Sequence, residues 1–183
     1  IIPGYTFKPK KNIYNDKIKL SLVGCGGRGT GAVINALNAD DNIELISMCD
    51  VFEDILERSL NNLKDEFKGT SKIQVKNENC FTGFDGYKKT IDNADVVILA
   101  TPPGFRPQHF EYAVNSSKHV FVEKPVATDI SGIKRFIESA KIVKKKKLNV
   151  VVGLQRRYQP SYINTFKQVK RGMVGKITSG IVK

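Results

Sequence analysis

The chain has 183 residues, of which 40% are hydrophobic and 26% charged, and its formal net charge is +12. This length suffices for one full domain, and the balance of apolar and charged residues is that of a folded protein rather than a disordered one. No apolar run approaches the roughly 20 residues that span a bilayer, and the three cysteines and two histidines lack the spacing of metal ligands or of a disulfide framework. We therefore expect no membrane segment and no metal site.

The excess of positive charge raises the alternative of a basic nucleic-acid-binding protein. The densest run, residues 144–147 (KKKK), falls at the predicted end of a helix, where cations complement the helix dipole. No aromatic residues are interleaved with it, so a solvated helix end explains the run better than a nucleic-acid surface. We expect no nucleic-acid partner.

The predicted elements alternate along the chain. Residues 1–16 are polar and contain Pro3, Gly4 and Pro9, which predicts an extended lead-in. Apolar runs predict strands at 18–23, 43–49, 95–100, 119–122, 149–154 and 176–182. Helical spacing predicts helices at 27–37, at 53–67, from Pro107, from Ile130 to the lysine run, and at 159–171.

Two of these helices carry apolar residues at helical spacing. Phe110, Ala113 and Val114 are expected to face inward, and the spacing of Ile130, Ile133, Ile137 and Ala140 marks one face of the next helix.

Strands that alternate with helices predict an α/β fold, a doubly wound parallel sheet with helices on both faces. The composition changes near Arg156, where an apolar strand gives way to a polar helix and a glycine turn. We therefore expect a lead-in (1–16), a sheet domain (17–156), and a connecting helix with the first strand of a truncated second α+β domain (157–183).

A glycine-rich loop, residues 24–29 (GCGGRG), lies between the first predicted strand and helix. Gly24, Gly26 and Gly29 fit the pattern G-x-G-x-x-G, in which the glycines permit a tight turn, close approach of a pyrophosphate, and packing of the helix on the strand. The helix N-terminus, which includes Gly27, offers free N–H groups to phosphates. Arg28 can add a charged contact or point to solvent. The loop predicts a dinucleotide-binding Rossmann fold.

Asp50 follows the second predicted strand, 21 residues after Gly29. A dinucleotide site of this kind needs an acid about 20 residues after the loop, which accepts hydrogen bonds from the ribose hydroxyls. Because such a carboxylate repels a 2′-phosphate, we expect NAD as the cofactor rather than NADP. The alternative is a glycine turn without a ligand, with Asp50 as a helix cap.

Two more loops follow buried strands at the edge where ligands bind in open α/β sheets. Thr101 and Pro102 follow the strand at 95–100, and Glu123-Lys124-Pro125 follows the strand at 119–122. The proline that follows Lys124 is a candidate for a cis peptide. Lys124 is placed to hydrogen-bond a reacting hydroxyl or to take part in its proton transfer, although most lysines in a basic chain are merely solvated.

Together these residues resemble the glucose–fructose oxidoreductase, inositol dehydrogenase and rhizopine catabolism family (Gfo/Idh/MocA). The resemblance runs from about Lys17 onward and rests on VGCGGRG at 23–29, Asp50, ATPP at 100–103, HFEYAVNSSKHVFVEKP at 109–125, and GLQRRYQPSY at 153–162. It implies an NAD(P)-binding Rossmann domain at 17–156, with hydride passing between nicotinamide and a carbon of a sugar, polyol or related carbohydrate.

The resemblance also implies roles for particular residues. Lys124 matches the active-site lysine, and Glu123 matches an acid near the nicotinamide ribose. Thr101, Pro102 and His109 match positions lining the cofactor cleft, while Gln155 and Arg157 match a segment that approaches nicotinamide and substrate. Gln155 stands where asparagine is common. The family's second domain, with an aspartate–histidine catalytic element, is missing here, so we expect this fragment alone to be inactive.

The leading hypothesis is a dehydrogenase acting on a small carbohydrate-like molecule, a homo-oligomer when full length. One alternative is a redox-neutral, NAD-dependent glycoside hydrolase of the same family, and another is a non-catalytic dinucleotide-binding module. The compartment is expected to be the cytoplasm, or the periplasm if an upstream export signal was removed.

Overall fold

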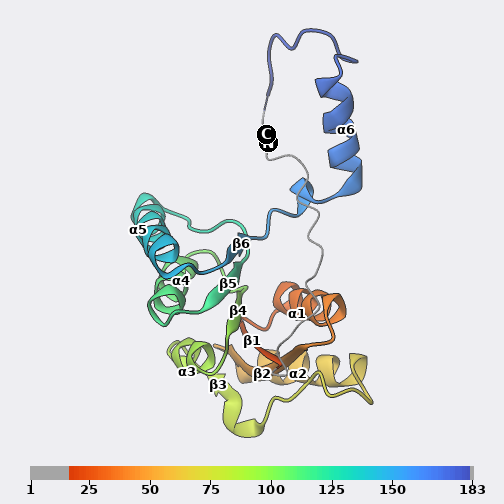
Figure 1. Cartoon of the computed structure of the whole chain (residues 1–183). Coiled ribbons are helices and arrows are strands. Elements are labelled where there is room, and N and C mark those ends of the chain that lie inside the picture. The colour runs from red at the N-terminus through yellow and green to blue at the C-terminus, as the bar shows by residue number, and fades with distance from the viewer. Residues whose placement is uncertain (1–16, 182–183) are drawn as a thin grey trace.

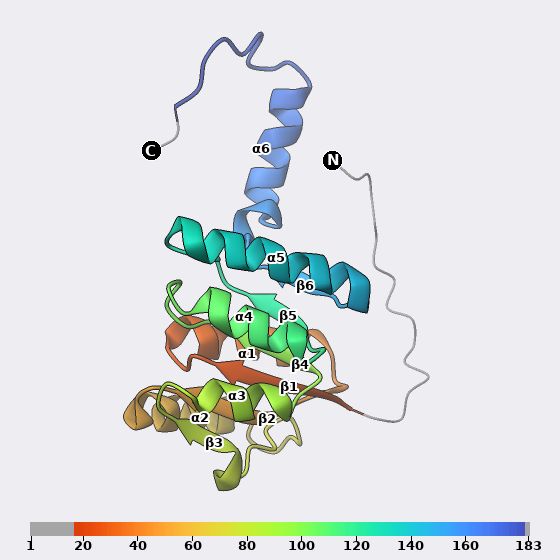
Figure 2. The same cartoon turned by 90° about the vertical axis from the view of Figure 1, so that its left-hand side faces the viewer.

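The computed structural model describes residues 17–181, so the predicted lead-in at 1–16 and the last two residues lie outside it. Six strands form one parallel sheet in the order β3-β2-β1-β4-β5-β6 (Figures 1 and 2). The strands are β1 (Ile18–Val23), β2 (Ile43–Asp50), β3 (Cys80–Thr82), β4 (Val96–Leu99), β5 (His119–Val122) and β6 (Val150–Val152). The predicted doubly wound Rossmann fold is confirmed, because this strand order is the one expected for a dinucleotide-binding sheet.

Helices cover both faces of the sheet (Figure 1). They are α1 (Gly27–Ala39), α2 (Glu53–Glu66), α3 (Gly86–Asp92), α4 (Arg106–Asn115) and α5 (Ile130–Lys146), while a further helix, α6 (Pro160–Lys170), lies apart from the sheet. The chain runs outward from β1 through β2 to β3, then returns to β4 and continues to β6. Because crossovers between parallel strands are right-handed as a rule, reversing direction moves the later helices to the opposite face.

Two apolar clusters, one on each face, hold these layers together. One joins Leu22 of β1 and Leu45 of β2 to Val33, Leu37 and Leu63 of α1 and α2. The other packs strand residues against α3, α4 and α5, and includes Phe110, Ala113 and Val114, which are at most 1% exposed. Their predicted inward orientation is confirmed.

The helix α5 packs on a different face from the one its isoleucines mark. Ile130, Ile133 and Ile137 are 74%, 46% and 53% exposed, whereas Ser139 is buried and the ring of Phe136 stacks on Phe110 at a centroid distance of 4.0 Å. A Cβ on Gly132 would meet Pro107 of α4 at 3.0 Å. The small residues on this face let α5 approach α4 closely. The face that carries the isoleucines points away from the core.

Two further expectations from the sequence differ from the structure. The irregular stretch before β4 contains β3 and α3, which have three and seven residues and are too short for a periodic signal. The strand predicted at 176–182 is wrong over 176–181, which form no regular element. A strand requires a neighbouring strand to hydrogen-bond, and the backbone hydrogen bonds of residues 171–175 are local turns. The helix α6 leads away from the sheet after β6 (Figure 2).

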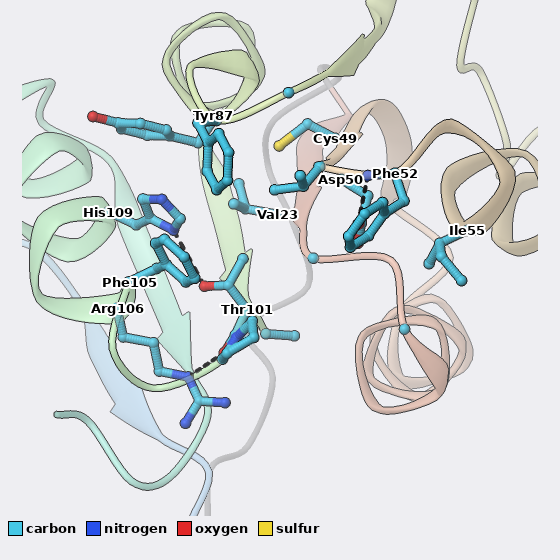
Figure 3. Close-up of a pocket in the computed structure, with 17 residues that line it drawn as sticks. Val23, Cys49, Asp50, Phe52, Ile55, Tyr87, Thr101, Phe105, Arg106 and His109 are labelled. Atoms are coloured by element: carbon cyan, nitrogen blue, oxygen red, sulfur yellow. Dashed lines mark hydrogen bonds between the residues drawn. The ribbon is translucent and has the colours of Figure 1, made fainter. Parts of the chain in front are cut away.

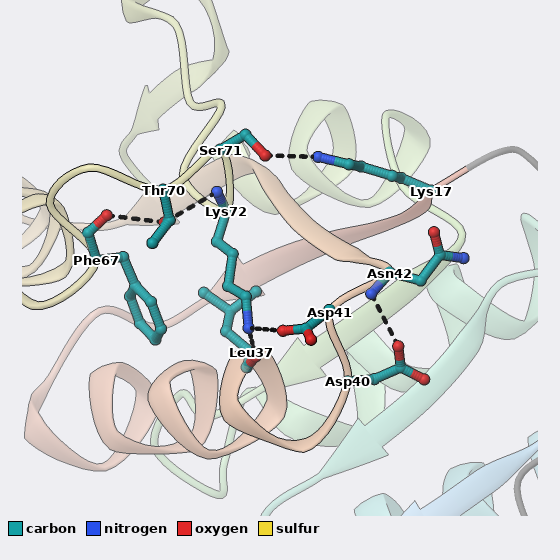
Figure 4. Close-up of polar contacts among 9 residues, drawn as sticks. All are labelled: Lys17, Leu37, Asp40, Asp41, Asn42, Phe67, Thr70, Ser71 and Lys72. Atoms are coloured by element: carbon teal, nitrogen blue, oxygen red, sulfur yellow. Dashed lines mark hydrogen bonds and ion pairs between the residues drawn. The ribbon is translucent and has the colours of Figure 1, made fainter.

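Lysines hold helix ends in two places. Lys72 donates to the carbonyl of Leu37 at 2.5 Å, in the last turn of α1, and pairs with Asp41 at 2.8 Å (Figure 4). Lys146, within the predicted basic run, donates to the carbonyls of Val114 and Asn115 at 3.1 and 2.6 Å, at the end of α4. A cation suits a helix C-terminus, so this part of the lysine run supports the fold. Over residues 17–181, no helix is both long and apolar enough to cross a bilayer.

Candidate functional site

The glycine loop joins β1 to α1 at the carboxyl edge of the sheet. Gly24 has φ +95°, and a Cβ there would lie 2.6 Å from the backbone nitrogen of Thr101. Gly29 leaves even less room, because a Cβ would lie 2.0 Å from the carbonyl oxygen of Gly24. Gly26, Gly27 and Arg28 are exposed at the start of α1, where the N–H groups lack helical acceptors. The loop therefore has the backbone geometry of a phosphate-binding turn.

Asp50 points at this loop from the end of β2. One carboxylate oxygen accepts a hydrogen bond from the backbone N–H of Cys25 at 2.7 Å, and the other accepts one from the N–H of Phe52 at 3.1 Å. The carboxylate is partly exposed. The acid and the glycine turn, predicted to act together, are thus in direct contact.

A cavity of about 620 Å³ opens between the loops that follow β1, β2 and β4 (Figure 3). Gly24, Gly26 and Asp50 line one side, and Thr101, Pro102 and His109 line another. The remaining wall is largely aromatic, from Phe52, Phe84, Tyr87 and Phe105. Six of the residues predicted to bind cofactor are therefore gathered around one space, of the size that small-molecule sites occupy.

His109 lies between the rings of Tyr87 and Phe105 in the aromatic wall (Figure 3). Its Nδ1 is 3.2 Å from Oγ1 of Thr101, and the ring of Tyr87 lies over it at a centroid distance of 4.2 Å. Burial lowers the pKa of His109 from its ordinary value of 6.5 to about 4. At neutral pH the imidazole is therefore uncharged, and it can present a hydrogen-bonding atom to Thr101 without placing a cation in the wall.

This low pKa predicts that the fold loses stability in acid. Because unfolded His109 titrates near 6.5 and the folded residue near 4, the unfolded chain gains the proton first as the pH falls. We expect His109 to contribute a loss of about 2 kcal/mol between pH 7 and pH 5. Urea titrations of wild type and His109→Gln at both pH values isolate this contribution as a difference. An equal loss in both proteins would contradict it.

Cys49 lines the larger cavity and Cys25 lies in the glycine loop, and both thiols are buried. Burial raises the pKa of Cys49 to about 12 and raises that of Cys25 as well. Both thiols therefore stay protonated at physiological pH, and Cys25 donates its S–H to the carbonyl of Cys49 at 3.2 Å.

A second cavity, of about 340 Å³, adjoins the first through Ala100 and Arg106. It is lined by Lys124, Glu123 and Gln155 together with Arg28. Lys124 is exposed, and the Lys124–Pro125 peptide is cis, as its position suggested. The predicted active-site lysine and the predicted dinucleotide site are therefore neighbours.

Glu123 is buried in this second cavity with only 3% exposure. One of its carboxylate oxygens pairs with a guanidinium nitrogen of Arg28 at 2.5 Å. A Cβ on Gly153 would lie 2.6 Å from the same oxygen, so a side chain there would displace the carboxylate of Glu123. Arg28 was expected to contact phosphate or solvent. In the structure it links the glycine loop to the loop after β5, and its contact with phosphate stays a prediction.

Gln155 and Arg157 belong to a short 3-10 turn, Gln155–Arg157, that follows β6. Gln155 lines the second cavity, whereas Arg157 lines neither cavity and is exposed. The cofactor role of Arg157 stays a prediction. Among residues 17–181, no three His, Cys, Asp or Glu side chains gather as metal ligands would.

Sequence reasoning missed the aromatic wall and Arg106. Arg106, 6% exposed, donates from Nε to the carbonyl of Thr101 at 2.8 Å (Figure 3). From Nη1 it donates to the carbonyls of Glu123 and Pro125 at 3.0 and 2.5 Å. An arginine directly before Pro107 at a helix start, where cations are unfavourable, was the signal available in the sequence.

A family model described as an oxidoreductase family with an NAD-binding Rossmann fold matches residues 18–154. Among solved structures, myo-inositol 2-dehydrogenase from Lactobacillus plantarum is 27% identical, with a TM-score of 0.70 over 88% of this chain and 43% of its own. The scyllo-inositol dehydrogenase from Lactobacillus casei, solved with NAD(H) and scyllo-inositol, is 25% identical, with a TM-score of 0.66 over 89% of this chain and 44% of its own.

A curated relative of another activity, a glycosyl hydrolase family 109 protein from Streptomyces coelicolor, is 25% identical over 89% of this chain. That match covers 33% of the relative. The chain thus spans between a third and under half of the proteins to which it is similar.

Proposed function

Because the chain belongs to the Gfo/Idh/MocA oxidoreductase family and carries its NAD-binding Rossmann fold, we propose that it is the dinucleotide-binding part of a carbohydrate dehydrogenase. Hydride would pass between nicotinamide and a hydroxyl-bearing carbon of a sugar, polyol or related molecule. The contact between Asp50 and the N–H of Cys25 carries this proposal, because it sets the ribose-binding acid against the phosphate-binding turn.

The two cavities support a division of labour along the dinucleotide. The larger one, with Asp50 and the aromatic wall, suits the adenosine half. The pyrophosphate would lie at the start of α1 between the cavities, against free N–H groups. The smaller cavity, with Glu123 and Lys124, suits the nicotinamide half and the substrate hydroxyl. NAD, when bound, supplies the hydride acceptor, and the protein supplies orientation and proton handling.

Lys124 would hold the substrate hydroxyl and help its proton to leave. We expect Lys124→Met to leave the Kd for NAD within about threefold of wild type while lowering turnover by about 10²-fold or more. Binding can be measured on this chain. Turnover can be measured on a longer protein that contains these 183 residues and matches its relatives in length. Lys141→Met, which alters an exposed lysine on α5, is the matched control. Undiminished turnover in the Lys124 variant would remove its assigned role.

The hydrolase relative favours a second candidate function. A redox-neutral enzyme would oxidise a glycoside transiently, eliminate its leaving group, add water to the double bond that results and return the hydride, so it would need tightly held NAD. A chromogenic glycoside separates the two: release of the leaving group without net NADH formation supports hydrolysis, and accumulation of NADH supports dehydrogenation. For the complete enzyme we propose a homo-oligomer acting on a small molecule.

A further inference from the structure

Arg106 holds the lysine-bearing loop from both sides. Its Nη1 donates to the carbonyl of Glu123, the residue before Lys124, and to that of Pro125, the residue after it. Its Nε donates to Thr101 in the loop after β4. One side chain therefore fixes the backbone on either side of Lys124 relative to the loop that separates the two cavities.

Arg106 occupies a position where a cation is unfavourable for the stability of the helix. It is the first residue of α4, where the helix dipole disfavours a cation, and it is 6% exposed. Burial of a guanidinium is unfavourable, and the carbonyls of three loop residues compensate for it. All three acceptors lie in loops that border the cavities, so the hydrogen bonds that compensate for the burial of Arg106 also tie it to the site.

Lys124 itself is exposed, and among the described residues none is recorded as a hydrogen-bond or ion-pair partner of its ammonium group. A long flexible side chain is best placed by fixing the backbone from which it extends. In the smaller cavity Arg106, Glu123 and Lys124 are neighbours, and Arg28 holds the carboxylate of Glu123. Arg106 therefore fixes the backbone around Lys124, and Arg28 fixes the carboxylate of Glu123.

We propose that Arg106 is a positioning residue for the nicotinamide half of the site, acting through the backbone of Glu123, Lys124 and Pro125. This rests on the proposed function, because it assigns the smaller cavity to nicotinamide. It predicts that loosening the loop weakens contacts to nicotinamide more than contacts to the adenosine half, whose cavity Arg106 also borders. A residue needed only for folding would affect both halves alike.

The test compares NAD with ADP, which lacks nicotinamide and its ribose, on the 183-residue chain. Arg106→Met removes the three hydrogen bonds, and Arg106→Lys keeps the charge without the planar fork. We expect Arg106→Met to weaken NAD binding by about tenfold and Arg106→Lys by less, with ADP affinity lowered by no more than about threefold in either. Arg135→Met, an exposed arginine on α5 that pairs with Glu111, is the control.

A second readout follows Lys124 directly. Limited acetylation with acetic anhydride and peptide mapping gives the rate at which each lysine is modified, with Lys141 as an internal reference. NAD should slow acetylation of Lys124 in wild type, and Arg106→Met should lose most of that protection. Equal NAD affinity and equal protection in wild type and variants would overturn the proposal, and so would unfolding of both variants. Absence of NAD binding by folded wild type would instead refute the proposed function.

Discussion

Replacing Gly29 with alanine should abolish dinucleotide binding and destabilise the fold by about 3 kcal/mol or more, the upper range for an overpacked position. The added Cβ would lie 2.0 Å from the carbonyl oxygen of Gly24, 3.1 Å from Leu22 and 3.2 Å from Ala100. The first of these atoms belongs to the backbone of the phosphate loop, so relief requires the loop itself to move. The same displacement would carry the N–H groups of the loop away from the pyrophosphate.

Gly31 provides a control within the same helix. A Cβ there would meet nothing within 4 Å, so Gly31→Ala should be neutral or stabilise the chain by about 0.5–1 kcal/mol through helix propensity. Urea unfolding and calorimetric titration with NAD measure both properties for the two variants. If Gly29→Ala kept the stability and the NAD affinity of the wild type, α1 and β1 would not pack as tightly as described.

Removing the carboxylate of Asp50 should weaken NAD binding by about 10²-fold, since a charge-assisted pair of hydrogen bonds to a ribose is worth about 3 kcal/mol. In Asp50→Ala the loss has two sources, because the side chain also accepts from the N–H groups of Cys25 and Phe52. Asp50→Asn separates them: its amide oxygen can keep one backbone bond, while the negative charge is gone.

The asparagine variant is therefore the sharper test of cofactor choice. Without repulsion of the 2′-phosphate, the ratio of NADP to NAD affinity should rise by about tenfold, an effect of about 1.4 kcal/mol. Asp54→Asn, which alters an exposed acid in the first turn of α2, should leave the ratio unchanged. An unaltered preference in Asp50→Asn would mean that this carboxylate does not face the ribose.

The sequence predicted the sheet well where local signals were strong. Each strand longer than three residues begins and ends within one residue of its predicted limits, because an apolar run bounded by glycine or polar residues is a local feature. The contact of Asp50 with the glycine loop was also predictable, since parallel strands bring their carboxyl ends together.

What escaped prediction depends on contacts distant in sequence. Gly132 and Phe136 face α4, and this orientation depends on Pro107 and Phe110 of the other helix. Likewise Arg106 donates to carbonyls 17 and 19 residues away, which no local pattern reveals. Arg28 lies 95 residues from its partner acid. The polar connections of the site thus belong to the assembled sheet rather than to any motif.

Calorimetric titration of the folded 183-residue chain with NAD and, separately, with NADP tests the central claim most directly. If the turn after β1 grips a pyrophosphate and the acid after β2 holds the adjoining ribose, NAD should give saturable heat at one site per chain and NADP should bind more weakly. A chain shown by circular dichroism to be folded that gives no binding heat with either dinucleotide would contradict the account.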